Sequence, residues 1–222
     1  MESSNIVRAR TASKIVLRSF EGVRMTDVSK IKIDFPNTGQ YNEDDPRFIE
    51  ELGLLHADLS VPGAIKRACI HEVGHLPYAR MFGALSHFAP EEFWFLGPAV
   101  TYCLNRNNEY EFDHYVAATR LPFTSDDLDY ADDKLLALAK ACFAGGVFVH
   151  ELDEPSRRGD IDDVKKFHRY YKSALKQRGQ MDRLESTLKK LAIDAVTFDL
   201  RPEVVRQTAL AQANYFETEY FS

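Results

Sequence analysis

The residues with the clearest chemical potential are two histidines and a glutamate in the segment His71-Glu72-Val73-Gly74-His75. Residues four positions apart share one face of a helix, so the imidazoles of His71 and His75 can reach one metal ion at about 2.0–2.1 Å. Glu72 is offset by one residue, which suits a general base that takes a proton from a water molecule on the metal. The pattern therefore predicts a catalytic zinc site.

A catalytic zinc site needs a third protein ligand and keeps its fourth position open. A third histidine six residues after His75 would complete one common pattern, but Met81 occupies that position. The remaining candidates are carboxylates further along the chain, and spacing alone does not choose among them. They are Glu91, Glu92, Glu109, Glu151, Asp160, Asp162 and Asp163.

The segment that carries the motif is predicted to be a central helix. Ser60 is a suitable N-cap, and Pro62 fits the first turn. An apolar stripe at helical spacing lies opposite the two histidines and consists of Ile65, Cys69, Val73 and Leu76. Pro77 lacks the N–H that a helix interior needs, so we expect the helix to kink or end there.

The rest of the chain predicts a small β portion followed by helices. Alternating apolar residues indicate a strand within 23–35 and a β-hairpin within 93–115 that turns at 105–108. Helices are expected near 131–150, 160–177, 181–197 and 202–215. The fold class is therefore α+β, predominantly α-helical, with a small hairpin or sheet and a zincin-like His-Glu-x-x-His helix at the core.

We expect this fold to form one main domain with two flanking segments. Residues 1–59 form an N-terminal segment with a short strand, residues 60–200 form the zinc domain, and residues 201–222 form a C-terminal helix and aromatic tail. The aromatic tail covers the core or buries against a second subunit, which leaves a homo-oligomer open.

Three segments resemble the peptidase domain of the FtsH family of membrane-anchored AAA proteases. Residues 68–75, Ala-Cys-Ile-His-Glu-Val-Gly-His, are similar to that family's A-x-x-H-E-A-G-H helix. The helix from Asp133 through Ala144-Gly145-Gly146 to Leu152 resembles its segment ending G-G-R-A-A-E-E-L. Residues 159–164, Gly-Asp-Ile-Asp-Asp-Val, resemble its G-A-S-N-D-L segment. The resemblance covers roughly residues 60–195.

The resemblance implies roles for particular residues. In that family the aspartate of the third segment completes the zinc site, and that position corresponds to Asp163 here. The family also has a strand beside the zinc that pairs with extended substrate, and Val100, Thr101 and Tyr102 lie in the similar stretch. The resemblance thus implies a zinc metalloendopeptidase in which His71, His75 and Asp163 hold zinc and Glu72 activates a zinc-bound water.

The chain also departs from that family. It contains no ATPase module, no phosphate-binding glycine-rich loop and no transmembrane helix, and Val149-His150 replaces an Ala-Glu pair. Such a protein would hydrolyse peptide bonds in short or unfolded polypeptides, or receive its substrates from a separate unfoldase.

Composition narrows the partners and the compartment. The formal net charge of −6 argues against a broad nucleic-acid or acidic-membrane surface. Three widely spaced cysteines indicate free thiols rather than a disulfide framework. No secretory signal is visible, and no apolar run approaches the roughly 20 residues of a membrane helix. We therefore expect a cytoplasmic protein.

Two other classes of function compete with the peptidase. One is a catalytically inactive descendant of the same fold that serves as a binding or regulatory module, although the retained Glu72 argues against it. The other is a di-iron carboxylate protein, because Glu72 with His75 and Glu111 with His114 both have the required i, i+3 form. The strand pattern around Glu111 argues against that alternative.

Overall fold

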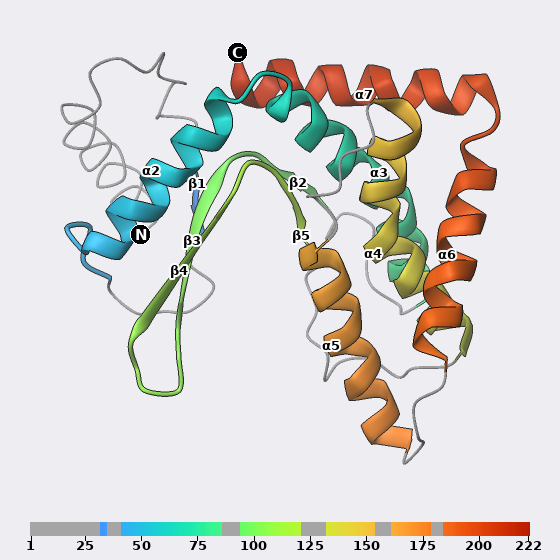
Figure 1. The fold of residues 1–222 in the computed structure, drawn as a ribbon, viewed down its shortest axis with the longest axis horizontal. Helices are drawn as coiled ribbons and strands as arrows, with labels where there is room; N and C mark the ends of the chain where they lie inside the picture. Colours follow the sequence, from blue (N-terminus) through green and yellow to red (C-terminus); the bar gives the residue numbers. More distant parts are fainter. Residues whose placement is uncertain (1–31, 35–40, 86–93, 121–131, 154–160, 179–183) are drawn as a thin grey trace. The chain divides into compact units, whose positions relative to one another are not determined.

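The computed structural model describes residues 32–34, 41–85, 94–120, 132–153, 161–178 and 184–222 (Figure 1). Contacts divide the chain into two compact units, each built from separate stretches of sequence. The first unit comprises Met1–Ile65, Leu96–Ala118 and Phe216–Ser222. The second unit comprises Lys66–Phe95 and Thr119–Tyr215.

The first unit contains a three-stranded sheet and one helix. Strand β3 (Ala99–Leu104) is central, with β1 (Lys32–Asp34) parallel on one side and β4 (Tyr110–Tyr115) antiparallel on the other. β3 and β4 form the predicted hairpin, whose turn places Asn108 in the left-handed region at φ 60°. Asparagine tolerates that conformation better than most residues do.

Helix α2 (Pro46–Ser60) supplies the core of the first unit. Asp45 caps the helix by accepting a hydrogen bond from the backbone N–H of Arg47, and Pro46 occupies the first turn. Four apolar residues three or four positions apart form one buried face that packs with Val100 of β3. They are Phe48, Leu52, Leu55 and Leu59.

The second unit is mainly helical. Its helices are α3 (Ala64–Leu85, of which the first two residues belong to the first unit), α4 (Asp132–Leu152), α5 (Ile161–Arg178), α6 (Glu185–Asp199) and most of α7 (Glu203–Phe221). Strands β2 (Trp94–Leu96) and β5 (Ala118–Arg120) form a two-stranded sheet, and a boundary between the two units along the chain falls within each of these strands. The described residues thus form a predominantly helical α+β protein.

Helix α4 is the central element of the second unit. It packs along α6 and also contacts α5. Against α3 the approach is close, because a Cβ placed on Gly74 would lie 2.8 Å from the backbone oxygen of Ala144. Gly74 therefore allows α3 and α4 to pack with their backbones nearly in contact.

Helix α4 is also the one described helix that is long and apolar enough, by length and composition, to cross a membrane. The sequence-based expectation concerned uninterrupted apolar runs, and the longest one in this helix, 141–149, is much shorter than the roughly 20 residues of a membrane helix. In addition, 67% of its apolar window is buried inside the protein, as expected for the core helix of a folded unit.

Several boundaries differ from those predicted from the sequence. The four later helices are confirmed, although α7 continues to Phe221 where the sequence predicted an end near residue 215, and α2 was not predicted. Ser60 ends α2 instead of capping α3, and its hydroxyl donates to the backbone oxygen of Ala57. We expected α3 to kink or end at Pro77; it does not end there but continues to Leu85. The predicted strand at 23–35 is described only over Lys32–Asp34.

Candidate metal centre

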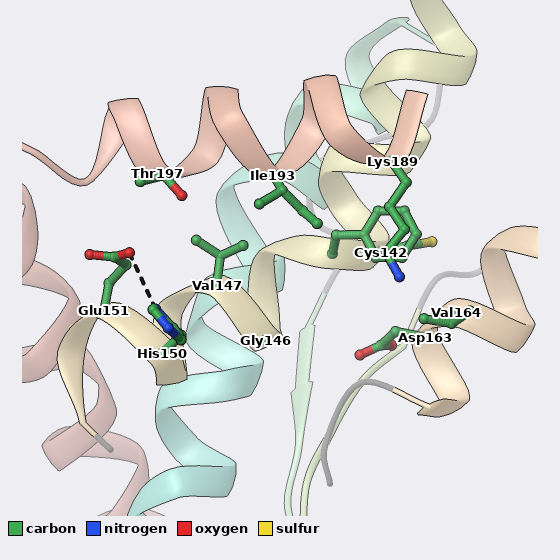
Figure 2. Close-up of a pocket in the computed structure, with 11 residues that line it drawn as sticks. Cys142, Gly146, Val147, His150, Glu151, Asp163, Val164, Lys189, Ile193 and Thr197 are labelled. Atoms are coloured by element: carbon green, nitrogen blue, oxygen red, sulfur yellow. Dashed lines mark hydrogen bonds and ion pairs between the residues drawn. The ribbon is translucent and has the colours of Figure 1, made fainter. Parts of the chain in front are cut away.

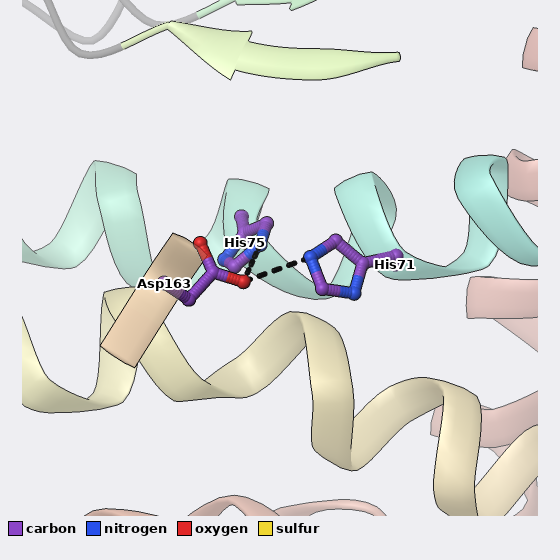
Figure 3. A group of neighbouring side chains, drawn as sticks. All are labelled: His71, His75 and Asp163. Carbon is purple, nitrogen blue, oxygen red and sulfur yellow. Dashed lines mark hydrogen bonds and ion pairs between the residues drawn. The ribbon is translucent and has the colours of Figure 1, made fainter. Parts of the chain in front are cut away.

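Three side chains from two helices converge on one point in the second unit. The Oδ2 atom of Asp163 lies 2.9 Å from Nε2 of His71 and 3.5 Å from Nε2 of His75 (Figure 3). His71 and His75 come from α3, and Asp163 comes from the first turn of α5. The structure thus brings these three predicted residues together, although Asp163 is 92 residues away from His71.

Helix geometry explains why these side chains meet. The i, i+4 spacing places the two imidazole rings on one face of α3, with centroids 4.6 Å apart. The N-terminal end of α5 favours a carboxylate, because the helix dipole and unpaired backbone N–H groups stabilise negative charge there. All three side chains are largely enclosed, with 9–14% of their side-chain surface exposed.

A hydrogen bond fixes the tautomer of His75. Its Nδ1–H donates to the backbone oxygen of Ala141 on α4 at 2.6 Å, which places Nε2 toward Asp163, with a proton in the cationic form and a lone pair in the neutral form. A ligating histidine typically donates its other ring N–H in this way, which fixes the ring orientation and raises its basicity. Helix α4 therefore orients one of the two candidate imidazole ligands.

Gly145 of α4 lies directly against both imidazoles. A Cβ at this position would lie 2.4 Å from Nε2 of His75 and 2.7 Å from Nε2 of His71. Only a residue without a side chain leaves this volume free. The two nitrogen atoms that could bind a metal thus face a space that the absence of a side chain keeps open.

The electrostatics of the cluster favour a positive charge at its centre. Burial opposes the charged form of His75, but hydrogen bonding and attraction to Asp163 outweigh it and raise the pKa of His75 to about 8. Burial likewise opposes the charged form of Asp163, yet the two histidines hold its pKa well below the usual range. Two imidazole nitrogens and one carboxylate oxygen therefore converge where a cation would be stabilised.

This donor set fits a divalent transition metal. Two histidines and one carboxylate are the protein ligands of many catalytic zinc sites, and the same set also binds non-haem iron. Such sites keep positions open for water and substrate. The enclosed geometry, the fixed tautomer of His75 and the space beside Gly145 all agree with a bound metal.

Glu72 lies on α3 next to His71 and is 8% exposed. Its backbone oxygen accepts a hydrogen bond at 3.1 Å from the hydroxyl of Thr119 on β5. This bond ties the turn of α3 that bears the motif to the two-stranded sheet. The backbone oxygen of the next residue, Val73, receives no helical hydrogen bond from Pro77, because proline lacks the N–H.

The other candidate third ligands are placed elsewhere or lie outside the described residues. Asp162 is 94% exposed and pairs with Lys165 at 3.3 Å. Glu109 accepts a hydrogen bond from Asn105 in the hairpin of the first unit. Glu151 interacts with His150 at 3.3 Å. Glu91, Glu92 and Asp160 lie outside the described residues.

The predicted substrate-binding strand belongs to the first unit. Val100 and Thr101 of β3 pair with Ile33 and Asp34 of β1 on one side and with His114 and Asp113 of β4 on the other. Tyr102 is 3% exposed and pairs with Phe112. Substrate addition at Val100 and Thr101 would therefore require β1 to leave, and the role of this strand stays a prediction.

The remaining histidines of the sequence-based hypotheses have other contacts. His168 is exposed and interacts with Glu185 at 2.8 Å. Glu111 and His114 both lie on β4, where residues three apart point to opposite faces of the sheet. They do not form the helical i, i+3 pair that a di-iron site requires, so that alternative was wrong.

A cavity of about 260 Å³ adjoins the cluster in the second unit. Asp163 and Val164 of α5 line it together with residues of α4 and α6 (Figure 2). Phe143 and Val147 of α4 and Ile193 of α6 make much of the wall apolar. One candidate ligand of the metal is thus also part of a cavity wall.

Sequence reasoning missed Gly145 and the cavity residues of α6. Two adjacent glycines, Gly145 and Gly146, interrupt an otherwise strongly apolar helix, which lowers helix propensity and signals a close approach by another group. This signal could have pointed to Gly145. No such signal pointed to the cavity, because Lys189 and Ile193 lie on a helix with no motif and line the cavity together with Asp163 only through tertiary packing.

Comparison of the chain with models of protein families, with curated proteins and with solved structures finds no match.

Proposed function

We propose that this protein is a zinc-dependent metallopeptidase that hydrolyses peptide bonds in short or unfolded polypeptides. The observation that carries the proposal is the convergence of His71, His75 and Asp163 on one point, next to Glu72 on the same helix. A purely structural metal site has no need of a general base. The combination of three ligands with an adjacent glutamate therefore favours hydrolysis.

Each residue has a specific task in this proposal. His71, His75 and Asp163 hold the metal, and the Ala141 carbonyl keeps Nε2 of His75 available for it. When bound, zinc supplies a Lewis acid that lowers the pKa of a water molecule and polarises a carbonyl oxygen. Glu72 accepts the proton of the attacking water and passes it to the departing amine.

We further propose that residues 60–195 adopt a zincin-like core akin to the FtsH peptidase domain. This rests on the three resembling segments described above and on Asp163, whose position follows from the third of them. Under this proposal Asp163, rather than one of the other carboxylates, is the third ligand. Its contacts with both histidines support that choice.

Metal analysis of the purified protein tests the proposal first. We expect about one zinc per chain in the wild type and less than a tenth of that in the variants His71→Ala and Asp163→Asn. Asp162→Asn is the matched control, because Asp162 is the exposed neighbour of Asp163, and this variant should keep its zinc. Zinc retained in Asp163→Asn would contradict the assignment of the third ligand.

Activity of Glu72→Gln separates the peptidase from an inactive module. The variant should keep its zinc but hydrolyse an unfolded protein such as casein about 10²–10⁴-fold more slowly than the wild type. Zinc-loaded wild type without any hydrolysis would favour a binding or regulatory module. Iron in place of zinc would contradict the proposed reaction class.

A further inference from the structure

The cavity beside Asp163 has a distribution of charge that indicates which substrate group it accepts. Lys189 of α6 lines the cavity, and its Nζ lies 5.3 Å from the centroid of the Phe143 ring. Among the described residues, no carboxylate forms an ion pair with Lys189. The cavity wall therefore contains an ammonium group that lies over an aromatic face and, within the described ranges, forms no ion pair with a carboxylate.

The two ends of the cavity differ in charge. Glu151 and His150 line it two turns after Phe143 on α4, roughly 12 Å away at 1.5 Å per residue. Figure 2 shows Lys189 and Asp163 near the Cys142 end and Thr197 near the Glu151 end. Lys189 therefore attracts an anion at the Cys142 end, where Asp163 opposes it, and Glu151 disfavours an anion at the other end.

A metal at the candidate centre would strengthen this preference. Without it, the carboxylate of Asp163 opposes an incoming anion. A divalent cation held by neutral histidines and Asp163 would offset the negative charges of Asp163 and Glu72, which leaves Lys189 as the net positive charge at this end. The apolar wall of Phe143, Val147 and Ile193 lowers the local dielectric constant and so strengthens the attraction.

We propose that this cavity is a substrate subsite that binds a carboxylate, with Lys189 as the recognising residue. The inference rests on the proposed peptidase function and names its substrate class. These substrates are peptides with an anionic group close to the cleaved bond. That carboxylate belongs either to an acidic side chain or to the free C-terminus of the peptide, since both offer the same chemistry. A volume of about 260 Å³ accommodates one side chain of this kind.

Binding of small hydroxamates tests the subsite without relying on catalysis. Hydroxamates chelate zinc, and the monohydroxamates of malonic, succinic and glutaric acid carry a carboxylate at increasing distance from the chelating group. We expect at least one of them to bind the zinc-loaded wild type about tenfold or more tightly than the neutral alkyl hydroxamate of equal length, by calorimetry. The best chain length reports how far Lys189 lies from the metal.

Variants of Lys189 identify the source of the preference. Lys189→Met keeps the aliphatic stem and should abolish the preference for the anionic hydroxamate, while zinc content and affinity for the neutral hydroxamate stay unchanged. Lys190→Met is the matched control, because Lys190 is exposed and pairs with Asp194. An equal preference in Lys189→Met and wild type would overturn the inference.

Different results would contradict the proposed subsite and the proposed zinc centre. If the neutral hydroxamates bind but none of the anionic ones binds more tightly, the subsite is wrong and the zinc centre stands. If no hydroxamate binds because no zinc is held, both are wrong. Displacement of the bound hydroxamate by peptides then distinguishes the two sources of the carboxylate. One pair of peptides compares a free C-terminus with its amide, and a second pair compares glutamate with glutamine inside the peptide.

Discussion

At the scale of single residues, the candidate centre depends on a position that has no side chain. A Cβ on Gly145 would meet Nε2 of both His71 and His75, and the carbonyl of Ala141 on the same helix orients His75. The three candidate ligands come from α3 and α5, yet α4 limits the volume of the candidate site and orients one of its rings. Alanine is the better helix former at such a position, which indicates that space, rather than helix propensity, explains the glycine.

The variant Gly145→Ala tests this dependence. Its methyl group would meet the mobile ends of the two imidazoles, so the rings should rotate away while the helices keep their places. We expect zinc affinity, measured by competition with a chelator, to fall at least tenfold. The free energy of unfolding without zinc should stay within about 1 kcal/mol of wild type.

Two neighbouring glycines serve as controls for Gly145→Ala. Gly146→Ala makes the same change in helix propensity one residue further on and should preserve zinc affinity. Gly74→Ala should instead destabilise the protein with or without zinc, because its Cβ would meet the backbone oxygen of Ala144 at 2.8 Å. Unchanged zinc affinity in Gly145→Ala would show that the rings do not occupy the space beside this glycine.

At the scale of elements, one histidine connects α2 with β4 in the first unit. His114 of β4 places Nδ1 against a carboxylate oxygen of Glu51 and Nε2 3.1 Å from Oδ2 of Asp58. Asp113 accepts a hydrogen bond from the backbone N–H of His114. Burial works to lower the pKa of His114, but the hydrogen bonds to Glu51 and Asp58 outweigh it and raise the pKa above 6.5.

This contact predicts a pH dependence of stability with a definite sign. Because the pKa of His114 is raised on folding, its contribution is fully present below about pH 6.5 and is lost as pH rises through the folded pKa. The difference in unfolding free energy between wild type and His114→Gln should therefore shrink between pH 6.5 and 9, measured by urea denaturation.

His56 provides the matched control for that prediction. Burial lowers the pKa of His56, so its unfolded form binds more protons than its folded form near pH 6.5 and both forms are neutral at higher pH. The difference in unfolding free energy between wild type and His56→Gln should therefore not shrink over the same range. A difference that also fails to shrink in His114→Gln would refute the ionic contact between α2 and β4.

The elements also show what the sequence could predict. Strong periodicity and turn residues were sufficient for the hairpin and the four later helices, since both signals are local. Helix α2 was not predicted, although Asp45 and Pro46 are a helix start signal and its buried residues have helical spacing. Continuation of α3 past Pro77 could not be predicted locally, because proline disfavours a helix interior and only packing against other elements can outweigh that preference.

The same limit applies to the candidate site. The two histidines and Glu72 follow from spacing within one helix, so the sequence alone placed them together. Asp163 was one of several carboxylates until the family resemblance singled it out. The contribution of Gly145 and the cavity at Lys189 depends on how α4 and α6 pack, which no local pattern encodes.

At the scale of the whole molecule, the candidate ligands all belong to one of the two units. Zinc binding should therefore stabilise that unit selectively, by about 4 kcal/mol when free zinc is 1,000 times the dissociation constant. In amide hydrogen exchange we expect zinc to slow exchange in α3, α4 and α5 and to leave β3 and β4 unchanged. The variant His71→Ala, with and without zinc, is the control. Equal slowing in the hairpin would show that the two units unfold together.

The two units are interleaved along the chain, with boundaries after Ile65, Phe95, Ala118 and Tyr215. The shortest continuous stretch that contains Glu72 and all three candidate ligands, 71–163, also contains the whole hairpin of the other unit. No single cut can therefore separate the unit with the candidate metal centre as a fragment. During synthesis the ribosome must likewise release β3 and β4 before Asp163 emerges, so the three candidate ligands can meet only after that hairpin is available to fold.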